Sequence, residues 1–509
     1  MNAPMNEKAQ ALVLSFLILL AFYIGLGSFP LFDLDEGAFS AATMEMRIRG
    51  DWVTPWLYGE PRFDKPILIY WCQLVATALF GTNEWSLRLP SALAATGWMA
   101  ALYGFARRYF PGSEWLTVTV ASCSLMTLVI ARAATADALL NLFLTLTCLS
   151  VWRYLDRPTT GRATLTYLWM GLGFLAKGPV AMVIPFVTLL VFTLVSGRWR
   201  DMGRALVFLP GWAVFFIVAA PWYYLVYKAQ GQAFVEGFFL GHNLGRFTDT
   251  MEGHGGSLLY YLPVLLYIAL PFTGVLLAVL YKWQHWWKRP VGRFLLVWFA
   301  VTFTVFSLSD TQLPHYLLYG MPPLWLLMAN YLRLVHNRLV LVVPLLVFAL
   351  LLLALPFVLE SLVATAQDYA RLVMLGAIDA FSPTYFVIVQ FVLGICVLFL
   401  VGGNVLRPHG PLLIGTLSAF CILTTVVPVL AEAQQSPVKQ AALFARAAGK
   451  NVVTAASNMP SFSVYLGSVT EKRPPETGEW VFTRTDKLEQ FDIERLVFQQ
   501  GTASLFESK

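Results

Sequence analysis

The stretch from Phe32 to Glu60, FDLDEGAFSAATMEMRIRGDWVTPWLYGE, begins with a group of carboxylates at Asp33, Asp35 and Glu36. It directly follows the apolar run ALVLSFLILLAFYIGLG at residues 11–27. A run of this length approaches the roughly 20 apolar residues that cross the hydrocarbon core of a bilayer. Ionisable side chains are costly at that depth, so acids gathered at the end of such a run need either a partner or a function.

The composition is that of a membrane protein. Hydrophobic residues make up 58% of the 509 residues and charged residues 13%, against about 25% charged in soluble domains. A sequence pI near 9.0 would fit nucleic-acid binding, but Lys and Arg gather in short loops between apolar runs. The cysteines have no paired spacing and lie in apolar segments, which predicts packing residues and neither disulfides nor metal ligands; they are Cys72, Cys123, Cys148, Cys396 and Cys421.

Apolar runs of sufficient length predict a bundle of about thirteen transmembrane helices, the first of them at the N-terminus because no small-residue cleavage site follows that run. Basic residues gather in alternate loops, such as RYLDRPTTGR at 153–162 and KWQHWWKRPVGR at 282–293. Since loops inside the cell are enriched in Lys and Arg, the N-terminus is predicted to be cytoplasmic. The acidic first loop, residues 30–85, is then predicted to lie on the outer side.

The composition becomes mixed polar and apolar near Glu432. A helix-like run is followed there by short β-prone runs, NVVTAA at 451–456, FSVYLG at 462–467 and EWVFTR at 479–484. We therefore expect a transmembrane domain at 1–431 and a small α/β domain at 432–509. An odd number of spans places that domain on the same outer side as the first loop.

Asp35 and Glu36 begin a segment that can form a helix at the membrane surface. Carboxylates at a helix N-terminus stabilise the helix dipole, and a carboxylate can equally serve as a general base or position an acceptor. Asp64 and Lys65 stand immediately before the apolar run PILIYW and leave the same alternatives open. They are either a snorkelling anchor pair or part of a site.

Basic residues on the outer side run against the topological bias. Arg88 and Arg132, close to carboxylates, therefore indicate a bound anion such as a phosphate. Asp137 begins a span on that side, and Lys177 lies at the tip of a hairpin between two spans. Later outer loops add His242, Arg246, Asp249, Glu252, His254, Asp310, His315 and Tyr316.

Ionisable side chains from separate outer loops at one depth predict a single polar cavity. Asp64 with His242 and His254 could ligate a divalent metal, although their spacing matches no compact metal motif. No other cofactor is expected.

The motifs DLDEGAFSAATMEMRIRGDWVTPWLYGEPRFDKPILIYW, GTNEWSLRLPSALAA, ARAATADALL, LGFLAKGPVAMVIP, GHNLGRF and SDTQLPHYLLYGMPPL occur in order over about the first 330 residues. Together they resemble the bacterial relatives of protein O-mannosyltransferases, and within these the lipid A aminoarabinose transferases. The resemblance implies a C-type (GT-C) integral-membrane glycosyltransferase of the bacterial inner membrane, with interfacial helices in its first loop and a periplasmic C-terminal domain. Its implied partners are an undecaprenyl or other polyprenyl phosphate sugar as donor and lipid A or lipopolysaccharide as acceptor, with no nucleic acid.

Residue by residue, the resemblance implies catalytic carboxylates at Asp35 and Asp137, and we count Glu36 with them. It implies donor-phosphate contacts from Lys65, Arg246 and Lys177, to which we add Arg88. The expected substrate-binding residues are Arg62, Asp64, His315 and Tyr316. The sequence departs from the family motif Glu-Lys-Pro at Asp64-Lys65-Pro66, and from the common Ser-Lys of the late loop at Ser309-Asp310, which removes a phosphate contact.

The predicted reaction is an inverting transfer in which Asp35 orients or deprotonates the acceptor. Transfer to protein or to another glycan is the alternative within the same class. A transporter or flippase for lipid-linked sugars is the alternative from another class. It predicts repeated halves and polar sites near mid-membrane, whereas the charges here collect at the outer boundary. A third alternative is a purely structural assembly subunit. It is ranked last, because it would leave the acidic and basic cluster without a function.

Overall fold

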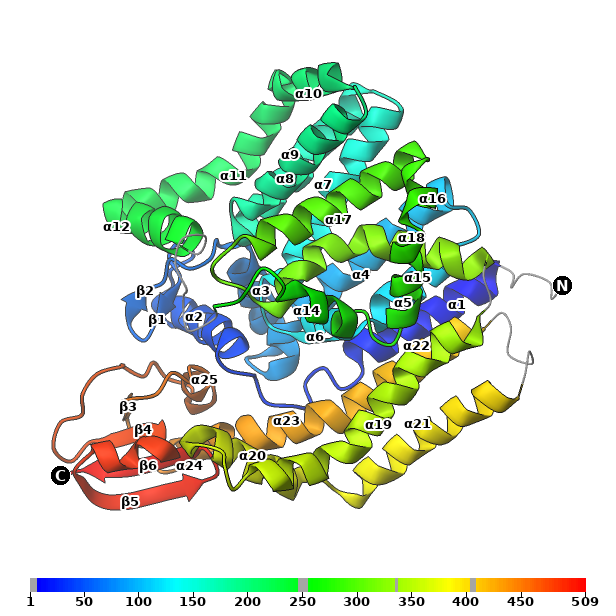
Figure 1. The fold of residues 1–509 in the computed structure, drawn as a ribbon. Helices are drawn as coiled ribbons and strands as arrows, with labels where there is room; N and C mark the ends of the chain where they lie inside the picture. Colours follow the sequence, from blue (N-terminus) through cyan, green and yellow to red (C-terminus); the bar gives the residue numbers. More distant parts are fainter. Residues whose placement is uncertain (1–6, 246–254, 335–336, 403–408) are drawn as a thin grey trace.

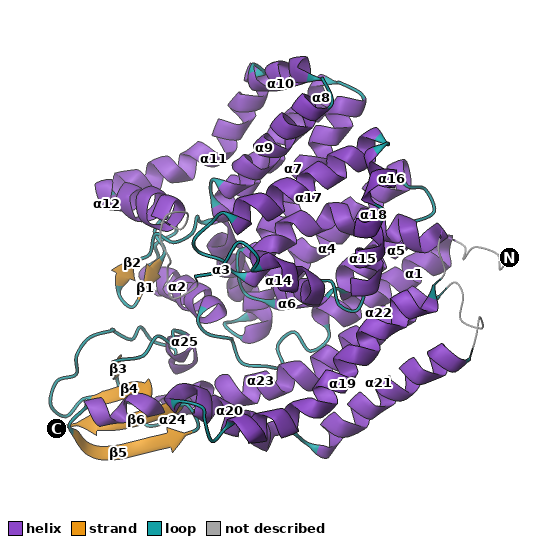
Figure 2. Cartoon of the chain, viewed as in Figure 1, coloured by secondary structure: helices purple, strands orange, loops and turns teal. Residues whose placement is uncertain are grey.

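The computed structural model describes residues 7–245, 255–334, 337–402 and 409–509 and is mostly helical (Figures 1 and 2). Within this described part, 6 helices are long and apolar enough to cross a membrane. They are α7 (Asp137–Asp156), α11 (Leu209–Gln230), α17 (Pro290–Ser307), α19 (Arg338–Leu362), α21 (Pro383–Val401) and the segment Gly410–Gln434, which comprises α22 (Gly410–Cys421), η5 (Ile422–Val426) and α23 (Val427–Gln434). The prediction of a multi-pass membrane protein is thus confirmed.

The expected count of about thirteen spans is not confirmed, because several apolar runs are broken or short. α5 (Glu114–Cys123) and α6 (Leu125–Arg132) are bent by 72° at Ser124, so this pair is either one broken span or a re-entrant loop. Ser124 has an extended backbone, which interrupts the helix. Shorter apolar helices are Lys8–Tyr23, formed by α1 (Glu7–Ile18) and η1 (Leu19–Tyr23), α3 (Leu68–Phe80) and α9 (Val180–Val195).

The bundle is centred on α4 (Glu84–Tyr109), α7 and α8 (Thr160–Lys177), while α19, α21 and α22–α23 form a layer along one side (Figure 1). Large buried aromatic residues fill its core, including Trp98 and Trp325, whose ring centroids are 5.2 Å apart. A buried tryptophan is stabilised where its indole N–H has a partner. That of Trp298 donates to the Tyr319 carbonyl at 3.1 Å, which ties η3 (Pro314–Gly320) to α17 beside the candidate site.

The remaining helices connect these spans. They are α10 (Trp199–Leu206), α12 (Gln232–Phe234), η2 (Val235–Leu244), α14 (Tyr261–Ile268), α15 (Thr273–Tyr281), α16 (Trp283–Trp287), α18 (Met321–Leu334) and α20 (Asp368–Ala380).

The first loop contains α2 (Asp35–Arg49) and a two-stranded hairpin of β1 (Trp56–Leu57) and β2 (Glu60–Pro61). The helix has acids in its first turn and arginines in its last, as the helix dipole favours. Gly50 ends it with φ +67°, a left-handed conformation that glycine adopts without strain. The expected helix therefore forms, but Glu36 to Met46 are all buried, because α3 and α25 (Ser461–Leu466) cover it. The position of this helix at the membrane surface stays a prediction.

The C-terminal segment forms a four-stranded sheet in the order β3-β4-β6-β5. β3 (Val452–Thr454) pairs parallel with β4 (Trp480–Arg484), while β5 (Ile493–Gln500) and β6 (Ala503–Ser508) pair antiparallel, with η6 (Thr485–Gln490) between β4 and β5. α24 (Ser436–Ala447) and α25 pack on this sheet in one hydrophobic core. That core also takes in Leu31, Ala41, Leu87 and Ala134, so the sheet unit is docked on the first loop (Figure 1).

Candidate active site

Asp137 lies at the centre of a buried polar cluster. It begins α7, and Lys177 ends α8, so the antiparallel pair places both side chains at one end of the bundle. The Lys177 ammonium lies 2.5 Å from the carboxylate of Asp137. The hydroxyl of Tyr319 donates to the same carboxylate oxygen at 2.6 Å and accepts from Lys177 at 2.9 Å. The structure thus brings together two predicted residues and one that the sequence analysis did not single out.

The late outer loop joins this cluster through η3. His315 Nε2 lies 3.6 Å from the Asp137 carboxylate, and the Tyr316 ring centroid lies 5.2 Å from the Lys177 ammonium. Burial lowers the pKa of His315, with further lowering by Lys177 and Lys65 against the opposing effect of Asp137. His315 is therefore neutral at pH 7 and can offer one hydrogen-bond donor and one acceptor.

A second cluster surrounds Asp64. Its carboxylate accepts two hydrogen bonds from Arg62, at 3.1 and 3.0 Å, and lies 2.9 Å from Nε2 of His242. Burial raises the pKa of Asp64, but Arg62, His242 and Lys65 outweigh it and hold the pKa well below its usual range. Asp64 is therefore ionised and orients Arg62 and His242. The Lys65 ammonium donates to the Asp64 backbone carbonyl at 3.1 Å, close to the same site.

The structure leaves part of the predicted donor and metal set untested. Arg246 and His254 lie outside the described residues. Among the residues that are described, no group of three His, Cys, Asp or Glu side chains could hold a metal ion. Asp64 and His242 form a direct pair, so a metal at this position would need a third ligand from elsewhere and stays a prediction.

A cavity of about 350 Å³ connects the Asp137 cluster with the first loop. Asp35, Asp137 and His315 line its polar wall. Its apolar wall comes from α6, η5 and α23, with Met126, Leu128, Val129, Ile422, Leu423, Val427 and Leu430. One end of the cavity is thus suited to ionised groups and the other to a hydrocarbon chain.

Asp35 differs from the other carboxylates of this region. Asp33, Glu36, Asp64 and Asp137 each accept hydrogen bonds from protein donors. The side chain of Asp35 is exposed toward the cavity and, within the described part of the chain, has no hydrogen bond or ion pair. A carboxylate at the mouth of a cavity without a protein partner is available to a substrate.

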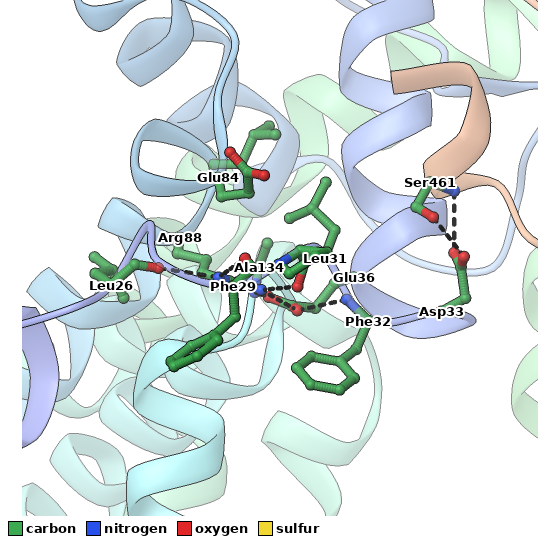
Figure 3. Close-up of polar contacts among 12 residues, drawn as sticks. Leu26, Phe29, Leu31, Phe32, Asp33, Glu36, Glu84, Arg88, Ala134 and Ser461 are labelled. Carbon is green, nitrogen blue, oxygen red and sulfur yellow. Dashed lines mark hydrogen bonds and ion pairs between the residues drawn. The ribbon is translucent and has the colours of Figure 1, made fainter. Parts of the chain in front are cut away.

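Glu36 and Arg88 form a buried ion pair that fixes the path of the first loop (Figure 3). The guanidinium donates twice to Glu36, at 2.8 Å, and also to the backbone carbonyls of residues 26, 29 and 30. All N–H groups of Arg88 are therefore used. Glu36 in turn accepts from the backbone N–H groups of Phe32 and Ala134. This geometry argues against the expected phosphate-binding role of Arg88 and catalytic role of Glu36, and assigns both to loop structure.

A further contact, not foreseen from the sequence, joins the first loop to the C-terminal sheet unit. The Asp33 carboxylate accepts from the backbone N–H of Ser461 at 3.0 Å and from its hydroxyl at 2.5 Å (Figure 3). The N–H of Leu31 donates to the Tyr465 hydroxyl at 2.6 Å. Because Asp33 lies two residues before Asp35, α25 helps to set where Asp35 enters the cavity.

Comparisons with known proteins show which families the chain is similar to. A family model described as dolichyl-phosphate-mannose-protein mannosyltransferase matches residues 64–225. The undecaprenyl phosphate-alpha-4-amino-4-deoxy-L-arabinose arabinosyl transferase of Yersinia enterocolitica is 30% identical over 337 residues, which cover 64% of this chain and 59% of that protein. Transferase 1 of that name from Proteus mirabilis is 29% identical over 350 residues, covering 66% and 62%. The resemblance seen in the motifs is confirmed. The matched region spans about three fifths of the length of these relatives.

Solved structures of this group have the same fold as the chain. ArnT from Cupriavidus metallidurans bound to undecaprenyl phosphate superposes with a TM-score of 0.80 at 20% identity, covering 98% of both chains. Its apo state gives a TM-score of 0.78 at 21% identity. An oligosaccharyltransferase from Archaeoglobus fulgidus is more distant, with a TM-score of 0.52 and 9% identity, covering 99% of this chain and 74% of its own. The chain therefore shares the fold of these ArnT structures over 98% of its length, which includes the C-terminal sheet unit.

Tyr319→Phe tests the role of the unforeseen cluster member. Loss of the hydroxyl removes its hydrogen bonds with Asp137 and Lys177, and we expect the rate of a reaction catalysed at this site to fall roughly tenfold in a protein that still folds. Tyr385→Phe is the matched control, because it loses a buried hydrogen bond to the Leu352 carbonyl away from this cluster. Equal rates for the two variants would show that Tyr319 has no part in the reaction.

Asp33→Asn tests the contact with α25. Burial raises the pKa of Asp33 from 3.8 to about 7, so the native state binds a proton that the unfolded chain has released between these pH values. Wild-type stability should therefore carry a favourable contribution at pH 4 that is lost as the pH rises through 7. We expect thermal unfolding in detergent to show a smaller difference between pH 5 and pH 8 in the Asn variant. An unchanged difference would contradict the assignment to Asp33.

Proposed function

We propose that this protein transfers a sugar from a polyprenyl-phosphate donor to a lipid A or lipopolysaccharide-type acceptor. The observation that carries the proposal is a cavity with a polar cluster at one end of a hydrocarbon-lined groove. The carboxylate of Asp35 faces this cluster and has no hydrogen bond or ion pair among the described residues. A lipid-linked sugar presents both of these surfaces, a polar head and an apolar chain. The arabinosyl transferase activity in the names of the matched relatives supports a pentosyl donor on undecaprenyl phosphate.

In the proposed reaction an acceptor oxygen attacks the anomeric carbon of the sugar. The bond from that carbon to the donor phosphate oxygen breaks, and its electron pair leaves with the polyprenyl phosphate. Direct displacement inverts the anomeric centre. Where the acceptor is a hydroxyl, Asp35 takes its proton; where it is an ionised phosphate, no proton moves and Asp35 orients the acceptor.

The basic residues of the site stabilise the negative charge that develops on the departing phosphate. We assign this task to Lys65, with Arg246 as a further donor. Lys177 is held by Asp137 and Tyr319, so its charge is fixed at one place in the cavity and needs no rearrangement during the reaction. Arg62, Asp64, His315 and Tyr316 are proposed to contact the sugar.

The proposed location follows from the distribution of charge. The N-terminus lies in the cytoplasm, and the first loop and the C-terminal domain from residue 432 lie in the periplasm, with the transmembrane domain at 1–431 in the inner membrane. About thirteen spans, several of them broken or short, remain part of this proposal. The C-terminal domain supports the first loop through Asp33 and Leu31.

The test is sugar transfer in proteoliposomes with radiolabelled polyprenyl-phosphate sugars as donors. Lipid A, a glycan and a peptide are supplied in parallel as acceptors. Label appearing on lipid A supports the proposal and names the donor. Label on peptide or glycan would show that lipid A is not the acceptor. Movement of the donor across the bilayer without any transfer would show that the protein is a transporter and not an enzyme.

A further inference from the structure

Four arginines line a pocket at the end of the bundle opposite the candidate active site. The pocket has a volume of about 490 Å³ and is formed by Gly104, Arg107 and Arg108 of α4, Ser150 and Arg153 of α7, and Arg162 and Leu165 of α8. Asp137 begins α7 and Arg153 lies in its last turn. At 1.5 Å per residue these positions are roughly 25 Å apart, close to the thickness of a bilayer hydrocarbon core. The pocket thus lies at the level of the opposite headgroup layer.

The described residues around this pocket supply little negative charge. Asp156 is the nearby carboxylate, and it accepts from the Tyr109 hydroxyl at 3.0 Å and lies 3.8 Å from Arg108. In the part of the chain that the structure describes, the guanidinium of Arg153 has no hydrogen bond or ion pair. Arg153 therefore offers its charge to an anion that enters the pocket.

Arg162 has a different task at the same pocket. Its guanidinium donates to the backbone carbonyls of Arg153 and Arg157, at 3.3 and 2.6 Å. Arg157 is the C-cap of α7, where a helix leaves carbonyls without partners, and the Arg153 carbonyl also accepts from the Arg157 N–H. Arg162 therefore closes the helix end and is held in place at the wall of the pocket, so that a ligand would meet a fixed charge.

Other arginines at this end of the bundle show that basic loops do not by themselves make such a pocket. Arg198 and Arg204 both pair with Asp201, at 2.7 and 3.4 Å, within a single short helix and its cap. Their charge serves topology and local structure. Arg107, Arg108, Arg153 and Arg162 instead come from three helices and converge on one cavity.

We propose that this pocket binds the phosphate headgroup of an anionic phospholipid. Guanidinium groups bind phosphate oxygens through paired hydrogen bonds, which suits a cavity with several of them. The rim is apolar: Leu165 is 43% exposed, and a side chain added at Gly104 would meet open space. The acyl chains would therefore leave the pocket along α4 and α8, which a soluble phosphate does not require.

The test compares lipid binding by the full-length protein in neutral detergent, followed by native mass spectrometry. Dioleoylphosphatidylglycerol and dioleoylphosphatidylcholine are titrated separately. We expect the anionic lipid to bind at a concentration at least tenfold lower than the zwitterionic one. The double variant Arg107→Gln/Arg153→Gln should lose that preference; Arg162 is left intact because it closes the end of α7.

The control removes the same charge elsewhere at this end of the bundle, with Arg200→Gln/Arg289→Gln, and should bind the anionic lipid as the wild type does. Equal thermal unfolding of both double variants in lipid-free detergent shows that they fold. If Arg107→Gln/Arg153→Gln does not fold, the single variants Arg107→Gln and Arg153→Gln are compared with the wild type instead. Equal binding of the two lipids, or equal loss in both double variants, would overturn the proposal. Displacement of the lipid by inorganic phosphate at the same concentration would show that the pocket binds a soluble anion and not a lipid.

Discussion

Asp35→Asn is expected to lower the proposed sugar transfer about a thousandfold while changing the stability of the protein by less than about 1 kcal/mol. General base catalysis contributes roughly 10²–10⁴-fold, and the amide has almost no basicity while keeping the size of the side chain. Stability should change little, because within the described part of the chain the Asp35 carboxylate has no hydrogen bond or ion pair to lose, and only its interaction with the dipole of α2 is lost. The measurement is the steady-state rate of transfer in proteoliposomes, together with thermal unfolding of the same preparation.

Glu60→Gln is the matched control, since Glu60 is an exposed carboxylate of the same loop. It should transfer at the wild-type rate. The size of the loss separates the two acceptor chemistries. It should be larger with a hydroxyl acceptor, which must give up a proton, than with an ionised phosphate acceptor, which needs no base. Retention of more than a tenth of the activity would exclude Asp35 as a general base.

The general plan of this site could be predicted because it depends on local sequence and on membrane depth. Apolar runs indicate where spans begin, so the sequence alone places Asp137 and Lys177 at one end of the bundle. Their direct contact follows from an antiparallel helix pair. Tyr319 was missed, although it follows Tyr316 by three residues and so shares a helical face with it. That spacing was the available signal.

The different roles of the three first-loop acids could not be predicted from the sequence. Asp33, Asp35 and Glu36 are nearly adjacent, yet each points to a different environment, and the partners that decide this are distant in sequence. Arg88 is 52 residues from Glu36, and Ser461 is 428 residues from Asp33. Tertiary contacts of this kind leave no local pattern.

Local propensity also misled at one element of the C-terminal unit. The run FSVYLG was expected to be a strand, but it forms helix α25. A short apolar run fits either structure by pattern alone. Here Pro460 precedes the helix and Gly467 ends it with φ +83°, and the helix buries its apolar side chains between the sheet and α2.

Arg88→Ala is expected to destabilise the protein by about 3–5 kcal/mol, because it leaves the Glu36 carboxylate buried without its partner. The two side chains are only 5% and 6% exposed, so water cannot replace the lost guanidinium. The variant also leaves the backbone carbonyls of residues 26, 29 and 30 without donors. The free energy of unfolding, measured by reversible denaturation in mixed micelles, checks the value. Arg47→Ala, at an exposed position, should cost less than about 1 kcal/mol.

The double variant Glu36→Leu/Arg88→Met separates the ion pair from the backbone contacts. Replacing a buried pair by apolar side chains often restores stability, because no charge remains buried. Recovery here should be partial, since the loop carbonyls and the N–H groups of Phe32 and Ala134 still lack partners, each at about 1–3 kcal/mol when buried. A phosphate-binding Arg88 predicts a different outcome for the single variant, with normal stability and a raised KM for the donor. That result would support the phosphate-binding role of Arg88 that the sequence predicted.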